Sequence, residues 1–192
     1  MSLTQSTMLH LGTRAPDFTL PDPAGTLHSL EQVRGNKGLL VMFICNHCPY
    51  VQHIQASLTA ACHDFMAQEI GVVAINANDI ATHPEDAPEH MATVQQQFAY
   101  SFPYLFDATQ QSAKAYQAAC TPDFFLFDHY LKLHYRGRFD ASTPGNGKPV
   151  TGNDLRQAVA NLLQNQRPLT HQSPSMGCNI KWRTGNTPEY FT

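Results

Sequence analysis

Residues 39–49 read Leu-Leu-Val-Met-Phe-Ile-Cys-Asn-His-Cys-Pro. The first six form a continuous apolar run, which is typical of a short strand buried on both faces of a sheet. Pro49 suits the first position of a helix, because the N–H that proline lacks is not needed there. The stretch therefore predicts a buried strand over residues 39–44 and a helix from Pro49 to about Gln68, with two cysteines at the junction.

Strand and helix patterns alternate along the rest of the chain. Leu58, Ala61, Cys62 and Phe65 share one apolar helix face, so we expect Cys62 to lie in the core. A hairpin is predicted at residues 14–30, strands at 71–76, 104–107, 124–127 and 131–139, a loop at 80–90, and helices at 88–99, 109–119 and 154–165, the last with Asp154 as N-cap.

This order of elements favours an α/β fold, a three-layer sandwich with an N-terminal β-hairpin extension. The chain of 192 residues fits one domain, residues 1–192, with a core over about 11–165. Residues 166–192 are rich in Pro, Ser and Asn and predict an irregular C-terminal tail.

Composition excludes several classes of protein. Hydrophobic residues make up 42% of the chain and charged residues 14%, which argues against disorder. A net charge of -3 gives no basic surface for nucleic acid, and no apolar stretch is long enough for a membrane span. The first eight residues lack the basic start and apolar stretch of a secretory signal, so we expect a cytoplasmic protein, where disulfides are usually transient.

The pair Cys45 and Cys48 is the strongest chemical signal. A C-x-x-C between a buried strand and a helix start is typical of thiol redox sites. Unpaired N–H groups at a helix N-terminus favour a thiolate. If Pro49 is the first helical residue, Cys48 is the N-cap and has the better access to this field. We therefore predict Cys48 as the nucleophile and Cys45 as the resolving thiol, with His47 between them stabilising the thiolate.

Two other interpretations of the pair stay open. The cysteines could be buried structural thiols, or they could bind a metal with help from His47, His53 and Cys120. No second C-x-x-C or clear His pair follows, so the sequence predicts neither a metal nor a cofactor.

Three segments together resemble the peroxiredoxin-like branch of the thioredoxin superfamily. They are residues 15–20 (Ala-Pro-Asp-Phe-Thr-Leu), the strand with its cysteine motif, and residues 121–127 (Thr-Pro-Asp-Phe-Phe-Leu-Phe). The likeness spans about residues 11–165 and implies a thioredoxin-like sandwich. A cis proline faces the active-site thiols in this superfamily, which implies a cis bond at Pro122 after Thr121 and a supporting role for both residues.

The chain departs from the family's Pro-x-x-x-Thr-x-x-Cys pattern at two positions. Cys48 matches the peroxidatic cysteine, but Cys45 stands in place of the threonine and Val41 in place of the proline. The family also uses an arginine to bind peroxide, for which Arg136 and Arg138 are candidates. These departures favour disulfide exchange over peroxide reduction.

Two further thiols are weaker candidates. The resemblance places Cys120 near the pair, since it directly precedes Thr121, and the tail that carries Cys178 can fold back over the site. For each we weigh an uninvolved thiol against an additional redox thiol. The loop around Glu85 and Asp86, with His83 and His90, is interpreted as solvated rather than as a cation site.

The leading hypothesis is a thiol–disulfide oxidoreductase that acts on a protein disulfide and is recycled by a reductant thiol system. A thiol-dependent peroxidase with a peroxide substrate is one alternative. A metal-binding or partner-docking protein without turnover is the other. No nucleic-acid or membrane partner is expected, and the oligomeric state is not predicted.

Overall fold

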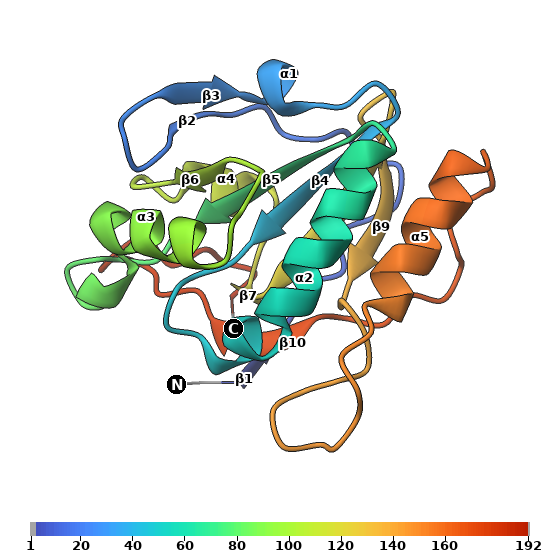
Figure 1. Ribbon diagram of the computed structural model, residues 1–192. Helices are drawn as coiled ribbons and strands as arrows, with labels where there is room; N and C mark the ends of the chain where they lie inside the picture. Colours follow the sequence, from blue (N-terminus) through green and yellow to red (C-terminus); the bar gives the residue numbers. More distant parts are fainter. Residues whose placement is uncertain (1–2, 192) are drawn as a thin grey trace.

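The computed structural model describes residues 3–191, and Met1, Ser2 and Thr192 lie outside the described part. Its centre is a sheet of five strands in the order β6-β5-β4-β8-β9 (Figure 1). The strands are β4 (Gly38–Phe43), β5 (Ile70–Asn76), β6 (Tyr104–Phe106), β8 (Asp123–Asp128) and β9 (Leu133–Gly137). β4 is parallel to β5 and antiparallel to β8, so it occupies the middle of the sheet.

Alternate residues of β4 face two separate cores, as expected of a strand covered on both sides. Leu40 and Met42 belong to one buried cluster, whereas Leu39, Val41 and Phe43 belong to the other. The first cluster packs under α2 (Pro49–Ala67), α3 (Pro88–Gln97) and α5 (Asn153–Leu163), and the second lies against α1 (Leu30–Val33) and α4 (Gln111–Ala115). The predicted three-layer sandwich is confirmed.

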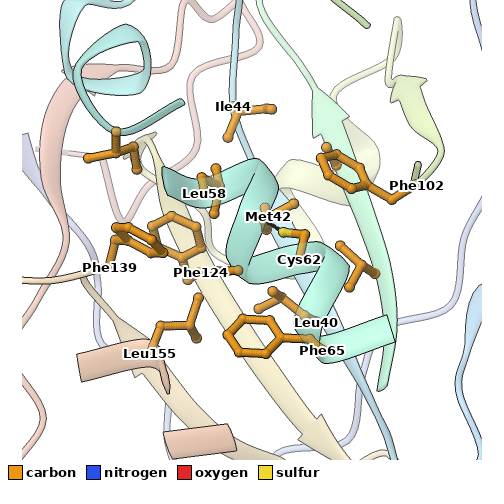
Figure 2. Packing of buried hydrophobic residues seen from close by; sticks show 14 of the residues in the cluster. Leu40, Met42, Ile44, Leu58, Cys62, Phe65, Phe102, Phe124, Phe139 and Leu155 are labelled. Carbon is orange, nitrogen blue, oxygen red and sulfur yellow. Dashed lines mark hydrogen bonds between the residues drawn. The ribbon is translucent and has the colours of Figure 1, made fainter. Parts of the chain in front are cut away.

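Helix α2 is fixed by its apolar face. Leu58, Cys62 and Phe65 are buried in the first cluster, and Figure 2 shows Cys62 pointing toward Met42. The two sulfur atoms are 3.9 Å apart. Cys62 is therefore a core residue, as predicted, and burial raises the pKa of its thiol.

The predicted hairpin is confirmed, and it precedes the central sheet in the chain. β2 (Thr19–Pro21) pairs antiparallel with β3 (Leu27–Ser29). In the turn between them, an Asp22 carboxylate oxygen accepts hydrogen bonds from the backbone N–H groups of Ala24 and Thr26.

Two details of the helices differ from the sequence expectation. α5 starts after Gly152 in a left-handed conformation, so Asp154 is not its N-cap. Asp154 instead forms an ion pair with Arg138, with Nε and Oδ2 2.6 Å apart. The helix expected at 109–119 is shorter, because Gln117 at φ 52° takes the chain out of the helical region after α4. A 3-10 turn, η1 (Pro84–Asp86), interrupts the loop before α3.

The prediction of an irregular tail is wrong for four residues. β10 (Met176–Asn179) is the middle strand of a second sheet, between β1 (Leu3–Gln5) and β7 (Cys120–Thr121). Figure 1 shows this small sheet next to the first turn of α2. A Met-Gly-Cys-Asn segment has no strand pattern of its own, so its two partner strands, both far away in the sequence, decide its conformation. Within residues 3–191, no helix has the length and apolarity to cross a membrane.

Candidate active site

Cys48 occupies the position predicted for it. It is the N-cap residue of α2, and Pro49 is the first helical residue. The N–H groups of the first turn lack intrahelical partners, so their partial positive charge favours a negative group at Cys48. The side chain is fully buried, and Cys45 is 2% exposed, so both thiols lie beneath the surface.

Hydrogen bonds around Cys48 favour its thiolate. Donation from the neighbouring Cys45 thiol is the largest cause of a pKa well below the usual thiol value; burial opposes it, and hydrogen bonds with Thr121 and Cys178 add to it. The Thr121 carbonyl oxygen acts in the other direction, since the protonated Cys48 thiol donates to it at 3.1 Å. The backbone N–H of Val51 also lowers the pKa of Cys48, so four hydrogen bonds stabilise the negative charge and the Thr121 carbonyl opposes it.

Cys45 has the opposite character. Burial, followed by its hydrogen bond with Cys48 and the charge of Asp86, raises the pKa of the Cys45 thiol. Its Sγ lies 3.4 Å from the Thr121 hydroxyl oxygen and 4.0 Å from His47 Nδ1. The lowered pKa of Cys48 and the raised pKa of Cys45 both favour a thiolate at Cys48, which is the direction that Pro49 predicts.

Asp86 holds the loop between the two cysteines, a role that no pattern in the sequence predicts. It is fully buried, whereas we expected a solvated loop. One carboxylate oxygen accepts the backbone N–H groups of Asn46 at 2.8 Å and His47 at 3.3 Å, and the other accepts His47 Nδ1 and Asn78 Nδ2, each at 2.7 Å. A turn rich in Pro and acidic residues looks the same in sequence whether or not its carboxylate is buried.

The His47–Asp86 pair sets the charge beside Cys45. The hydrogen bond to Asp86 raises the pKa of His47. Burial alone would raise the pKa of Asp86, but hydrogen bonds from His47 and Asn78 outweigh it and lower that pKa. His47 also stacks on His83, with ring centroids 5.1 Å apart. An imidazolium next to the motif adds to the field that favours a thiolate.

The Thr121–Pro122 segment faces the thiols as the resemblance implied. The peptide bond is cis, which confirms the expectation. Thr121 contacts both cysteines, through its hydroxyl to Cys45 and its carbonyl to Cys48.

Of the weaker thiol candidates, the structure brings Cys178 into direct contact with the pair. Cys178 hydrogen-bonds to Cys48, and burial together with this bond raises the pKa of Cys178. Cys120 lies behind the segment, with its Sγ 3.6 Å from the Pro122 carbonyl oxygen, and burial raises its pKa well above the usual value. Arg136 binds the Leu9 carbonyl and Gln172, and Arg138 pairs with Asp154, so the contacts of both arginines lie elsewhere.

One group of side chains has donor atoms suited to a metal ion. Within the described residues, Cys45, His47 and Asp86 place one donor atom each within 4.8 Å of one another. His53 and Cys120, the assisting ligands considered from the sequence, are not part of the group. His47 Nδ1 and Asp86 Oδ2 already hydrogen-bond to each other at 2.7 Å, so these two donor atoms are engaged in an ion pair.

Comparison with known proteins agrees with this geometry. The model of the AhpC/TSA family matches residues 11–136. The chain belongs to this family. The expected resemblance is confirmed, although the family's threonine is replaced by Cys45.

The chain is similar to a named thiol-disulfide oxidoreductase and to several solved structures. A thiol-disulfide oxidoreductase ResA from Geobacillus thermodenitrificans is 27% identical over 165 residues, which are 86% of this chain and 83% of that protein. A crystal structure of a hypothetical protein from Sinorhizobium meliloti 1021 has a TM-score of 0.93 at 50% identity, covering 95% of this chain and all of that one. A thioredoxin domain from Bacteroides vulgatus has a TM-score of 0.59 at 18% identity, covering 79% of this chain and 99% of that one. The last similarity shows that the fold is thioredoxin-like.

Proposed function

We propose that the protein is a thiol–disulfide oxidoreductase in which Cys48 attacks and Cys45 resolves. The observation that carries this proposal is the position of Cys48 at the start of α2 with the Cys45 thiol as hydrogen-bond donor. A thiolate is the nucleophile in disulfide exchange, and a second thiol within reach completes the reaction. The relative named ResA supports the same reaction class.

The reaction has two exchange steps. The Cys48 thiolate attacks one sulfur of a substrate disulfide, forms a mixed disulfide and releases the other substrate sulfur as a thiolate. Cys45 then attacks Cys48 Sγ, closes the Cys45–Cys48 disulfide and expels the second substrate sulfur, which takes the Cys45 proton. Two electrons pass to the substrate, and a reductant thiol system returns them to the pair.

His47 and Asp86 act as positioning residues in this scheme. Asp86 fixes the backbone of Asn46 and His47, so it sets the separation of the two cysteines. The hydrogen bond to Asp86 raises the pKa of His47, and protonated His47 favours the thiolate state of the site. Stabilising the reduced form in this way makes a disulfide a stronger oxidant.

The peroxidase alternative has less support. The threonine of the peroxide-binding pattern is replaced by Cys45, and both candidate arginines have partners outside the site. We propose protein disulfides as the substrate class and keep the cytoplasm as the proposed compartment.

Alkylation tests the polarity of the pair. Reduced wild-type protein and the Cys48→Ser and Cys45→Ser variants are treated with iodoacetamide across pH, and each cysteine is followed by peptide mass mapping. We expect Cys48 to react at pH values far below its ordinary pKa of about 8.5, also in Cys45→Ser. If Cys45 is instead the thiol that reacts at low pH, the assignment of roles is wrong.

Turnover and metal content test the function itself. The wild-type protein should reduce the disulfides of insulin with dithiothreitol as reductant, and Cys48→Ser should not. A peroxide-consumption assay on the same samples tests the peroxidase alternative. Stoichiometric zinc or copper bound through Cys45 and Cys48 in freshly purified, reduced protein would contradict the redox proposal.

A further inference from the structure

β10 places a third thiol against the attacking cysteine. Cys178 pairs with Thr121 and Asn179 with Cys120 in the ladder between β10 and β7. On its other edge, β10 pairs with β1, where Leu3 faces Cys178. Cys178 is 4% exposed and hydrogen-bonds to Cys48. Two ladders therefore fix the backbone that carries this sulfur, so the contact is part of the fold.

Gly177 allows this close approach. A Cβ at position 177 would lie 2.0 Å from the Thr121 carbonyl oxygen, which is the oxygen that also contacts Cys48. Any larger residue would push β10 away from the Thr121–Pro122 segment. The residue before Cys178 is thus the one that brings the strand within bonding range of the site.

Cys48 is the central sulfur of a chain of three thiols. It hydrogen-bonds to Cys45 and to Cys178. Burial and the shared Cys48 partner raise the pKa of both flanking thiols, so each carries a proton when Cys48 is ionised. Disulfide exchange requires an attacking sulfur and a leaving sulfur on the same central atom, and this order supplies both.

We propose that Cys178 is a third redox thiol, which exchanges with Cys45 for the disulfide bond to Cys48. This inference rests on the proposed thiol–disulfide activity. Cys178 attacks Cys48 Sγ in the Cys45–Cys48 disulfide, the Cys48–Cys178 bond forms and the Cys45–Cys48 bond breaks. The proton of Cys178 passes to Cys45. Two electrons are redistributed within the protein, and no external oxidant or reductant is needed.

The same attack resolves a mixed disulfide. When Cys48 is bonded to a substrate sulfur, Cys178 forms the Cys48–Cys178 disulfide and its proton goes to the departing substrate thiolate. The disulfide then links β10 covalently to the start of α2. Oxidation at Cys178 therefore adds a covalent link between β10 and α2 to the two ladders, and reduction removes that link.

The Cys45→Ser variant isolates this reaction. The reduced variant is mixed with oxidised glutathione, quenched with acid at intervals and mapped by mass spectrometry without reduction. We expect a transient glutathione adduct at Cys48 that converts to a Cys48–Cys178 disulfide. In Cys45→Ser/Cys178→Ser the adduct should persist on the order of tenfold longer, because the intramolecular thiol is gone.

Matched controls separate the third thiol from a general effect of removing a cysteine. Cys45→Ser/Cys62→Ala removes a core thiol that lies roughly 21 Å along the helix from Cys48, and it should behave like Cys45→Ser. An adduct that persists equally in Cys45→Ser and Cys45→Ser/Cys178→Ser overturns the inference, as does a disulfide to Cys120 in place of Cys178.

Wild-type protein gives a second measurement that does not depend on how the double variant folds. Equilibrated in a glutathione redox buffer, it should contain both the Cys45–Cys48 and the Cys48–Cys178 disulfides. A Cys45–Cys48 disulfide without any Cys48–Cys178 disulfide contradicts the third thiol alone. If wild-type protein does not reduce insulin, the proposed function itself is wrong. The insulin result is therefore independent of the test for the Cys48–Cys178 disulfide.

Discussion

At the scale of single residues, Asp86 is the side chain on which the geometry of the cysteine motif depends. Its carboxylate accepts two backbone N–H groups of the motif loop and the His47 ring. Removing a buried carboxylate of this kind leaves several donors without a partner, and each costs about 1–3 kcal/mol. The residue lies 38 positions after Cys48 in the chain, so only the tertiary structure reveals its role.

The Asp86→Asn variant should lose stability in a pH-dependent way. The pKa of Asp86 is lowered in the folded protein and that of His47 is raised. The pair therefore stabilises the wild type most fully between about pH 4 and pH 6.5, the unfolded pKa values. The benefit is lost as pH falls through the folded pKa of Asp86 or rises through that of His47.

Urea denaturation of wild type and Asp86→Asn across pH measures this difference, and NMR titration of His47 checks its cause. We expect the pKa of His47 to fall in the variant. Glu85→Gln is the matched control, since Glu85 is half-exposed and 3.9 Å from His47. A stability difference that does not vary with pH would contradict the ion-pair interpretation.

Asp123 should affect the pH dependence of stability in the opposite direction to Asp86. It is fully buried directly after Pro122, and burial raises its pKa well above the usual value. The folded protein keeps its proton while the unfolded chain releases it above about pH 4, so this group lowers stability as pH rises. Asp123→Asn should gain stability relative to wild type between pH 4 and pH 8 by about 1 kcal/mol or more, measured by urea denaturation. A constant difference over that range would show that Asp123 is ionised.

At the scale of elements, a helix or strand can be predicted from the sequence when its own residues carry the pattern, but not when its conformation depends on strands far away in the chain. β4 and α2 are correctly predicted because residues 39–49 carry a local pattern: an apolar run, then a proline at a helix start. β10 carries none, and its conformation depends on β1 and β7, which lie far away in the chain. The position of the C-x-x-C pair at the start of a helix could therefore be predicted, whereas the burial of Asp86 and the strand that carries Cys178 could not.

Gly177→Val tests whether β10 limits access to Cys48. A side chain at this position collides with the Thr121 carbonyl, so β10 should detach more easily. If the substitution destabilises the attached state of β10 by about 1.4 kcal/mol, β10 is detached about ten times more often. A thiol that reagents reach only when β10 is detached then reacts about tenfold faster. The measurement is the rate of Cys48 modification by a maleimide.

Met176→Ala is the control on the same strand, because Met176 is 36% exposed. Its modification rate should stay close to that of wild type. An unchanged rate in Gly177→Val would mean that reagents reach Cys48 by a path that β10 does not cover.

At the scale of the whole molecule, the redox state and the folding free energy are linked. The thiolate of Cys48 is stabilised by contacts that exist only in the folded, reduced protein. We therefore expect the reduced protein to melt several degrees higher than the oxidised one at pH 7, since about 1 kcal/mol corresponds to a few degrees for a chain of this size.

Thermal denaturation with and without dithiothreitol measures this difference. The gap should narrow as the pH falls through the lowered pKa of Cys48, because protonation removes the stabilised charge. Cys48→Ser should melt at the same temperature under both conditions. An oxidised form that melts at the higher temperature would contradict the stabilisation of the reduced protein by the Cys48 thiolate.

The pairing of Leu3 with Cys178 also has a consequence for the order of events during synthesis. Domains begin to fold while the chain is still being made, N-terminal part first. Cys45 and Cys48 leave the ribosome early, with the strand and helix that hold them, whereas β10 follows all the other strands of the described residues. The nascent chain thus carries its pair of thiols uncovered, and β1 stays unpaired, until residues 176–179 have been translated. A stalled or truncated product that lacks β10 would expose the Cys48 sulfur, which could then form a mixed disulfide with other proteins.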